Sequence, residues 1–193
     1  MIRVAVVEEA VALPDYRLIV LQGQLISAYL RTPLSVVGDG VKTIADLIIE
    51  LQGTFEQAGR RTKIDKDDKR IIFRLRRGGL DLSSVPLAKQ VVQLLDISNL
   101  SAGGTALDVT EDVAPRWRQL SVDIAQYLGL NFCGVDLACP DITTNTGEYY
   151  VLEVNSSPGL DHYGAIGSRQ EEIVRNLYAR VLNVAPQGAT PPT

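Results

Sequence analysis

Histidine and cysteine are scarce in this chain, which has one histidine and two cysteines among its 193 residues. Zinc sites and disulfide frameworks need several such residues at set spacings, so neither is supported. If the segment around Cys133 and Cys139 is a strand, both thiols lie on one face and Asp136 lies on the other. We interpret the two thiols as buried and inert.

Long apolar runs and blocks of one charge are also missing. No segment approaches about 18 consecutive apolar residues, and the N-terminus has no signal-peptide pattern, so we expect neither a membrane span nor a secretory leader. The net charge of −4 comes from 19 basic and 23 acidic residues spread along the chain, which argues against a nucleic-acid or membrane-surface protein. We expect a cytoplasmic protein with a small partner, folded as one compact body.

The apolar pattern of the first part predicts mixed α/β structure without internal repeats. Residues 3–11 are typical of a strand, and residues 16–31 are typical of a hairpin with a tight turn at Gln22–Gly23. A helix is predicted to begin after Thr43, the candidate N-cap, and to end at Gly53.

The rest of the chain is also predicted to contain both helices and strands. Residues 57–79 are polar and basic, and we interpret them as a solvated loop, with a mobile anion-facing segment as the alternative. A helix is expected to open at Pro115 and to end near Gly129. The remaining predictions are strands at 90–98, 131–139 and 149–156, a last helix with Ile173, Val174, Leu177 and Val181 on one stripe, and a disordered tail over 185–193.

The stretch "VLEVNSSPG" carries two polar side chains just before a strand ends. Glu153 and Asn155 point the same way, about 7 Å apart, whereas Leu152 and Val154 point into the opposite layer. If "GVDLAC" pairs beside this strand, Asp136 joins the same face. Two carboxylates and an amide oxygen are hard ligands of the kind that Mg²⁺ takes together with substrate phosphates. The alternative is a solvent-facing strand that merely carries polar residues.

Several motifs in order carry a family resemblance. "EVNSSPGLDHY", preceded by "GLNFCGVDL", resembles the C-terminal metal-binding signature of ATP-grasp carboxylate–amine ligases. The segments "DYRLIVLQGQLISAYLRTPLSVVGDG", "GLDLSSVP" and "DISNLSAGGTALDVT" are similar to the cyanophycin synthetase and bifunctional glutathione synthetase branch. Ribosomal-protein glutamate ligases are more distant relatives. The resemblance covers nearly all of residues 1–183.

The resemblance implies an α/β (α+β) fold, namely the C-terminal subdomain of an ATP-grasp fold with a mostly antiparallel sheet and flanking helices. Residues 1–184 would form this partial domain, starting at the hinge strand, and the subdomain that normally supplies a glycine-rich loop and lysines would be absent. The missing half would then come from a partner chain or from the full-length protein. A homodimer is the other partner that we consider.

The resemblance also implies ligands for ATP. Two Mg²⁺ ions, with Mn²⁺ as an alternative, would bridge the ATP phosphates. The implied metal ligands are Asp136, Glu153 and Asn155, and the residues implied around adenine and ribose are Glu8, Glu9, Ala10, Val11 and Asp15. The alternative for Glu8 and Glu9 is an ordinary exposed pair.

The loop "NLSAGGT" is implied to line the reaction centre. Glycines let backbone N–H groups approach an anion, so Gly103 and Gly104 would face a phosphate or acyl-phosphate, and Asn99 would donate from its amide. A plain turn is the alternative. Arg17 and Arg31 would offset negative charge on nucleotide or substrate; alternatively they are edge-strand surface arginines.

The implied reaction is activation of a carboxylate by ATP to an acyl-phosphate, followed by attack of an amine to form an amide. No protein nucleophile is required, and His162 is expected to hydrogen-bond near the mouth of the site rather than to act as a base. The competing hypothesis is a non-catalytic ATP-grasp remnant that serves as an interaction or scaffold domain.

Overall fold

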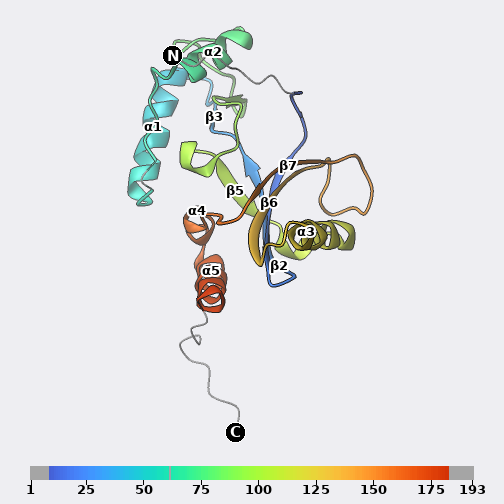
Figure 1. The fold of residues 1–193 in the computed structure, drawn as a ribbon. Coiled ribbons are helices and arrows are strands. Elements are labelled where there is room, and N and C mark those ends of the chain that lie inside the picture. The colour runs from blue at the N-terminus through green and yellow to red at the C-terminus, as the bar shows by residue number, and fades with distance from the viewer. Residues whose placement is uncertain (1–8, 61, 183–193) are drawn as a thin grey trace, which may run out of the picture. The chain divides into compact units, whose positions relative to one another are not determined.

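The computed structural model describes residues 9–60 and 62–182 (Figure 1). Most of the strand expected over 3–11, and the tail over 185–193, lie outside the described residues; residues 9–11 have no regular structure. The elements are β1 (Asp15–Leu21), β2 (Gln24–Thr32), β3 (Ser35–Val37), α1 (Ile44–Gln57), α2 (Lys69–Arg77), β4 (Val91–Gln93), β5 (Thr105–Asp108), α3 (Pro115–Tyr127), β6 (Phe132–Ala138), β7 (Tyr150–Asn155), α4 (Asp161–Gly164) and α5 (Ser168–Val181), with short 3₁₀ helices at Leu100–Ala102 and Thr110–Asp112.

The described chain divides into two compact units, where the length led us to expect one body. Unit 1 holds residues up to 30, 108–159 and those from 173 onward, and unit 2 holds 31–107 and 160–172. The main sheet has the strand order β5-β2-β1-β6-β7, and a second sheet pairs β3 with β4. None of the helices in the described part of the chain is long and apolar enough to cross a membrane.

The hairpin of β1 and β2 forms as predicted. Gln22 and Gly23 both have positive φ angles, 51° and 72°, which is the geometry of a type I′ turn. This turn matches the twist of the flanking strands and fixes their register. β1 pairs with β2 on one side and with β6 on the other, so it lies in the interior of the sheet.

One face of β1 and β6 forms the core of unit 1 with α3. Leu18 and Val135 are buried in it, and Trp117 of α3 is fully buried. The indole Nε1 of Trp117 donates to the carbonyl oxygen of Thr144 at 2.6 Å, so burial leaves its polar atom satisfied. The helix opens at Pro115 as predicted, and Gly129 follows its end with φ 66°.

Both cysteines are free and buried in this core. Burial raises the pKa of Cys133, and it raises the pKa of Cys139 to about 11. We expect both thiols to resist a water-soluble thiol reagent at about pH 8 in the folded protein and to react once it unfolds, because the thiolate is the nucleophile. Rapid labelling of the folded chain would contradict this.

The same shifts predict the pH dependence of stability. The folded state favours the neutral thiol of Cys139, so from a pH near 9.0 toward about 11 the unfolded chain ionises this group first. The free energy of unfolding is therefore expected to fall over that interval. Urea unfolding of wild type and of Cys139→Ala measures it: the loss with pH is expected to be smaller in the variant.

Unit 2 has its own core, built from α1, α2 and the short sheet. Thr43 caps α1 in a capping box with Asp46, as predicted. The prediction that the helix ends at Gly53 was wrong, because α1 continues to Gln57 and buries Phe55 two residues after the glycine. Burial of this aromatic ring outweighs the helix penalty of a single glycine, roughly 1 kcal/mol.

Part of the basic segment 57–79 is a helix rather than a loop. Asp68 caps α2 by accepting from the backbone N–H of Arg70 at 2.8 Å. Ile71 and Leu75 lie four residues apart and are buried, at 2% and 1% exposure. The prediction of a solvated segment was therefore wrong for α2, because two well-spaced apolar residues suffice to anchor a basic helix.

Candidate active site

Three polar side chains form a row across β1, β6 and β7. In the strand register Arg17 lies opposite Asp136, and Asp136 lies opposite Glu153. Their neighbours Leu18 and Val135 belong to the core that packs against α3, so the row lies on the other face of the sheet. The pairing expected for "GVDLAC" and "VLEVN" is confirmed, and it brings Asp136 beside Glu153.

Arg17 and Asp136 form a bidentate ion pair. Nε of Arg17 donates to Oδ1 of Asp136 at 2.6 Å, and Nη2 donates to Oδ2 at 2.7 Å. Asp136 is only 3% exposed, so the pair is shielded from water. Burial lowers the pKa of Arg17, but the hydrogen bonds and negative charge of Asp136 outweigh burial and raise that pKa above its usual value. Arg17 therefore carries a permanent positive charge on this face.

The alternative interpretation of Arg17 and Arg31 as edge-strand surface residues was wrong. Both strands that carry them, β1 and β2, lie inside the sheet. Arg31 is 7% exposed. The Arg17 side chain is 17% exposed, and the group that compensates its charge is Asp136.

β7 is an edge strand, and a bulge interrupts its pairing with β6. Leu137 pairs with Val151 while Asp136 pairs with Glu153, so Leu152 is the extra residue. Leu152 is 47% exposed, and the expectation that it packs in the opposite layer was wrong; Val154 does pack against the core of unit 1. The bulge leaves Glu153 directly opposite Asp136 at the exposed rim of the sheet.

Asn155 completes the predicted ligand set. It pairs in register with Gly134, two residues from Asp136, and its Nδ2 atom is buried without a hydrogen-bond partner among the described residues. An orphaned amide beside two carboxylates fits a site that a further ligand completes. No cluster of three or more His, Cys, Asp or Glu side chains suited to a metal occurs in the described part of the chain. Two carboxylates and one amide are the ligand types of a hard ion that also takes phosphate oxygens and water.

The proposed adenine and ribose contacts are only partly described. Glu8 lies outside the described residues, Glu9 and Ala10 are exposed, and Val11 is half-buried. Asp15 begins β1 two residues before Arg17, so both side chains lie on the same face of that strand. Contacts of these residues to a nucleotide stay a prediction.

The loop at residues 99–104 differs from the anion-facing loop that we predicted. The N–H of Gly103 donates to the carbonyl of Leu100, and the N–H of Gly104 donates to the carbonyl of Asn99, both at 3.1 Å. These two amides are used inside the loop instead of being presented to an anion. Asn99 precedes the 3₁₀ helix, is exposed, and makes no side-chain cap bond.

Close packing explains why the loop needs glycine at position 104. A Cβ on Gly104 would lie 2.6 Å from the carbonyl oxygen of Thr32. We expect Gly104→Ala to destabilise the protein by about 1–3 kcal/mol, because backbone must shift. Gly53→Ala is the matched control: nothing lies within 4 Å of its added Cβ, and a stabilisation of about 0.5–1 kcal/mol is expected in the helix interior. Urea unfolding measures both, and equal effects would contradict the packing argument.

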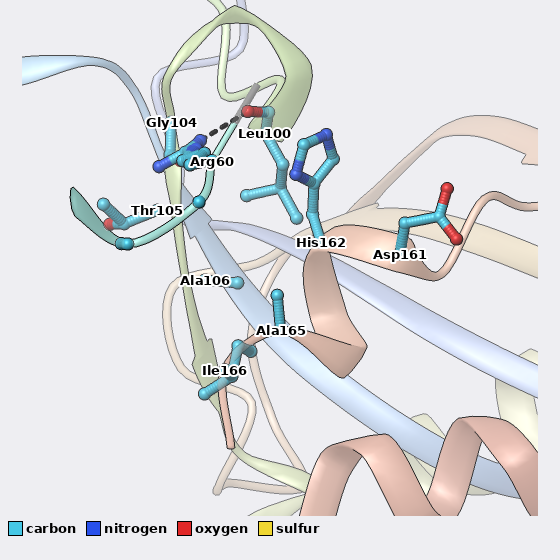
Figure 2. A pocket seen from close by; sticks show the side chains of 11 residues that line it. Arg60, Leu100, Gly104, Thr105, Ala106, Asp161, His162, Ala165 and Ile166 are labelled. Atoms are coloured by element: carbon cyan, nitrogen blue, oxygen red, sulfur yellow. Dashed lines mark hydrogen bonds between the residues drawn. The ribbon is translucent and has the colours of Figure 1, made fainter. Parts of the chain in front are cut away.

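A pocket of about 640 Å³ lies within unit 2 beside this loop (Figure 2). Its polar lining residues are Arg60, Thr105, Asp161 and His162, and the others are small or aliphatic. The sequence analysis missed Arg60, because it lies in a basic run. His162 lines this pocket as well, and its expected hydrogen bond near the mouth of the site stays a prediction.

Comparison with known proteins decides the fold. Residues 96–174 match the family model of the RimK-like ATP-grasp domain. A solved bifunctional glutathione synthetase from Pasteurella multocida superimposes with a TM-score of 0.67 and 29% sequence identity, over 89% of this chain and 25% of that one. The chain has an ATP-grasp fold. The α/β (α+β) class with a mostly antiparallel sheet and flanking helices is thereby confirmed.

The relatives of this ATP-grasp chain are the ones its motifs indicated. It is 35% identical over 159 residues to the glutathione biosynthesis bifunctional protein GshAB of Mannheimia succiniciproducens, covering 79% of this chain and 21% of the relative. It is 32% identical over 189 residues to the cyanophycin synthetase of Crocosphaera subtropica, covering 94% and 21%. The chain thus spans about a fifth of the length of these curated relatives.

The matched part of the ATP-grasp domain contains six of the thirteen predicted site residues. Asn99, Gly103, Gly104, Asp136, Glu153 and Asn155 all fall between residues 96 and 174. Asp136, Glu153 and Asn155 are brought together in unit 1, with Arg17 beside them, whereas Arg31, Asn99, Gly103 and Gly104 belong to unit 2. Arg17 joins the metal-ligand candidates through a contact that local sequence does not reveal.

Proposed function

We propose that this chain is the Mg²⁺- and ATP-binding part of an ATP-dependent ligase that joins a carboxylate to an amine through an acyl-phosphate. The observation that carries the proposal is the row of Arg17, Asp136 and Glu153 across three adjacent strands. The row sets one cation beside two neighbouring carboxylates, and Asn155 adds an amide next to it. The similarity to glutathione and cyanophycin synthetases supports the same reaction class.

Each residue has a role in this proposal. Asp136, Glu153 and Asn155 would hold Mg²⁺ through oxygen atoms, and the bound ions would neutralise charge on the transferring phosphoryl group. Arg17 fixes the Asp136 carboxylate in one orientation through two hydrogen bonds and adds a fixed positive charge. Positioning and electrostatics of this kind need no protein nucleophile.

The nucleotide site would be completed from outside these residues. ATP-grasp ligases hold ATP between two subdomains, and we propose that a partner chain or another segment supplies the second set of phosphate contacts. Glu9, Ala10, Val11 and Asp15, with Glu8, would contact the base and ribose. We propose that the choice of acid and amine depends on parts of the relatives that this chain does not span.

One observation favours the second candidate, a non-catalytic interaction domain. Asp136 is already neutralised by Arg17, so its burial does not by itself require a metal. Glu153 separates the candidates, because it forms no ion pair among the described residues and lies at the exposed end of the row. A scaffold would tolerate its loss, whereas a metal site would not.

Calorimetric titration with a non-hydrolysable ATP analogue, with and without Mg²⁺, tests the proposal. We expect saturable binding that requires Mg²⁺ and that Glu153→Gln weakens at least tenfold. The matched control is Glu111→Gln, because Glu111 lies in the same unit but outside the row. Binding that is indifferent to Mg²⁺ and to Glu153 would favour the scaffold.

A further inference from the structure

Helix α2 presents a ridge that has an apolar centre and a cation at each end. The ridge consists of residues spaced i, i+3, i+4 and i+7, namely Lys69, Ile72, Phe73 and Arg76. Phe73 is 69% exposed, both cations are exposed, and Ile72 is half-buried. The other side of the helix packs into the core of unit 2. These four residues, the α2 ridge, therefore form the surface that α2 turns away from that core.

A small cavity adjoins the α2 ridge. Its volume is about 340 Å³, and its lining residues are Ile72, Leu75 and Arg76 from the helix and Asp81, Leu82 and Ser83 from the following loop. Half of these side chains are aliphatic, and the volume is near the lower end of the range for ligand sites, roughly 300–1,000 Å³. A single exposed aromatic residue is ordinary, but one beside an apolar cavity offers a place to dock an apolar side chain.

The two cations of the α2 ridge differ from the other cations of this helix. Arg70, Arg74 and Arg77 each pair with an aspartate. Lys69 and Arg76 form no ion pair within the described residues, so their charges face solvent uncompensated. They lie seven residues apart, which is about 10 Å along the helix axis at roughly 1.5 Å per residue.

The charge around α2 has the opposite sign to that of the whole chain. Residues 57–79 contain nine of the 19 basic residues and three of the 23 acidic ones, although the net charge is −4. A local positive field of this kind attracts an anionic partner and selects its orientation.

Asp81 is the acidic group that lines the cavity. Its Oδ1 accepts hydrogen bonds from the hydroxyl and backbone N–H groups of Ser83 and Ser84, and these bonds lower the pKa of Asp81. The loop side of the cavity therefore carries a negative charge. Carboxylates of a partner are expected on the helix side, where Arg76 lies.

We propose that the α2 ridge is a docking site for an acidic segment of a partner protein, in which two carboxylates about 10 Å apart flank apolar side chains. The carboxylates pair with Lys69 and Arg76, and the apolar side chains pack on Phe73 and enter the cavity. Three residues of an extended segment span about 10 Å, so the pattern Glu-Leu-Phe-Glu has the required spacing. Nucleic acid fits less well, because it needs a longer row of uncompensated cations.

Titration of the isotope-labelled chain with the acetylated and amidated peptide Gly-Glu-Leu-Phe-Glu-Gly, followed by amide chemical shifts, tests the proposal. One control peptide has glutamine for both glutamates, and a second has alanine for leucine and phenylalanine. We expect saturable shifts at residues 69–76 and 81–83, with both controls bound at least fivefold more weakly in about 150 mM salt. Equal affinity of either control, or shifts that avoid α2, would overturn the proposal. No nucleotide or Mg²⁺ is added, so the result is independent of the proposed ligase activity.

Two substitutions of exposed residues locate the site without disturbing the core. We expect Arg76→Gln and Phe73→Ser each to lower the affinity for this peptide at least threefold. Arg77→Gln is the matched control, because it removes the same charge from the next residue of the helix, is 62% exposed, and lies outside the cavity. It is expected to leave the affinity unchanged. An equal loss in Arg77→Gln would mean that the peptide senses only net charge and would contradict the proposed site.

Single-stranded RNA is the competing anion, since a base can stack on an exposed aromatic ring such as Phe73. A uridine decamer titrated in the same salt distinguishes the two classes of partner. We expect it to bind more weakly than the acidic peptide. Tighter binding of the decamer would overturn the assignment to an acidic protein segment.

Discussion

Asp136→Asn is expected to weaken Mg²⁺-dependent binding of a non-hydrolysable ATP analogue on the order of 100-fold or more. Substituting a residue that only supports a metal ligand lowers metal affinity roughly 10–100-fold. Asp136 is proposed as a ligand itself, so a larger loss is expected. The amide keeps one hydrogen bond to Arg17 and nearly the same volume, but it leaves Arg17 without its counter-charge, so binding is compared at temperatures where urea unfolding shows the variant to be folded. Calorimetric titration of both proteins measures the change.

The control for this substitution is Asp123→Asn. Asp123 is an exposed residue of α3 in the same unit, hydrogen-bonded to Gln119. Asp123→Asn changes the net charge by the same amount outside the row, and we expect it to leave binding of the ATP analogue unchanged. If Asp136→Asn binds the analogue as tightly as wild type, the metal site is not at Asp136.

Arg17→Met is expected to reduce the free energy of unfolding by about 3–5 kcal/mol in the absence of metal and nucleotide. The substitution removes the bidentate ion pair that Arg17 makes with the 3%-exposed carboxylate of Asp136, and removing one partner of a buried ion pair is costly. Urea unfolding measures the loss. Added Mg²⁺ and nucleotide are expected to restore part of the stability, because a ligand that binds only the folded state stabilises it.

A double variant separates the charge from the packing. Arg17→Met with Asp136→Leu removes both charges, and hydrophobic replacement of a buried pair is often neutral. We expect the double variant to be more stable than Arg17→Met alone. A loss below about 1 kcal/mol in Arg17→Met would mean that the pair behaves as a solvated one.

Alternation along strands was enough to predict much of the site. The two-residue period places Glu153 and Asn155 on one face, and the same period separates Asp136 from the cysteines. It does not reveal the Arg17–Asp136 pair, because that contact joins residues 119 positions apart. The bulge at Leu152 is likewise a property of the pairing between β6 and β7 rather than of either strand's pattern.

The incorrect predictions for α1 and α2 also result from tertiary contacts, which a local sequence pattern does not reveal. Gly53 satisfies the local rule for a helix end, yet Phe55 extends α1 by packing into the core. In the run around α2 the charged residues outnumber the buried Ile71 and Leu75, so composition hides the stripe. Arg60 lies in the same basic region, and only the structure shows its bonds to the loop carbonyls.

We propose that Asp136 and Glu153 hold the metal of a bound nucleotide. Substituting Mn²⁺ for Mg²⁺ in the nucleotide complex and recording amide spectra of labelled protein tests it most directly, because a paramagnetic ion broadens signals near itself. We predict loss of the signals of Asp136, Glu153 and Asn155 at the lowest Mn²⁺ additions. Broadening that spares β6 and β7 while nucleotide is bound would contradict the account.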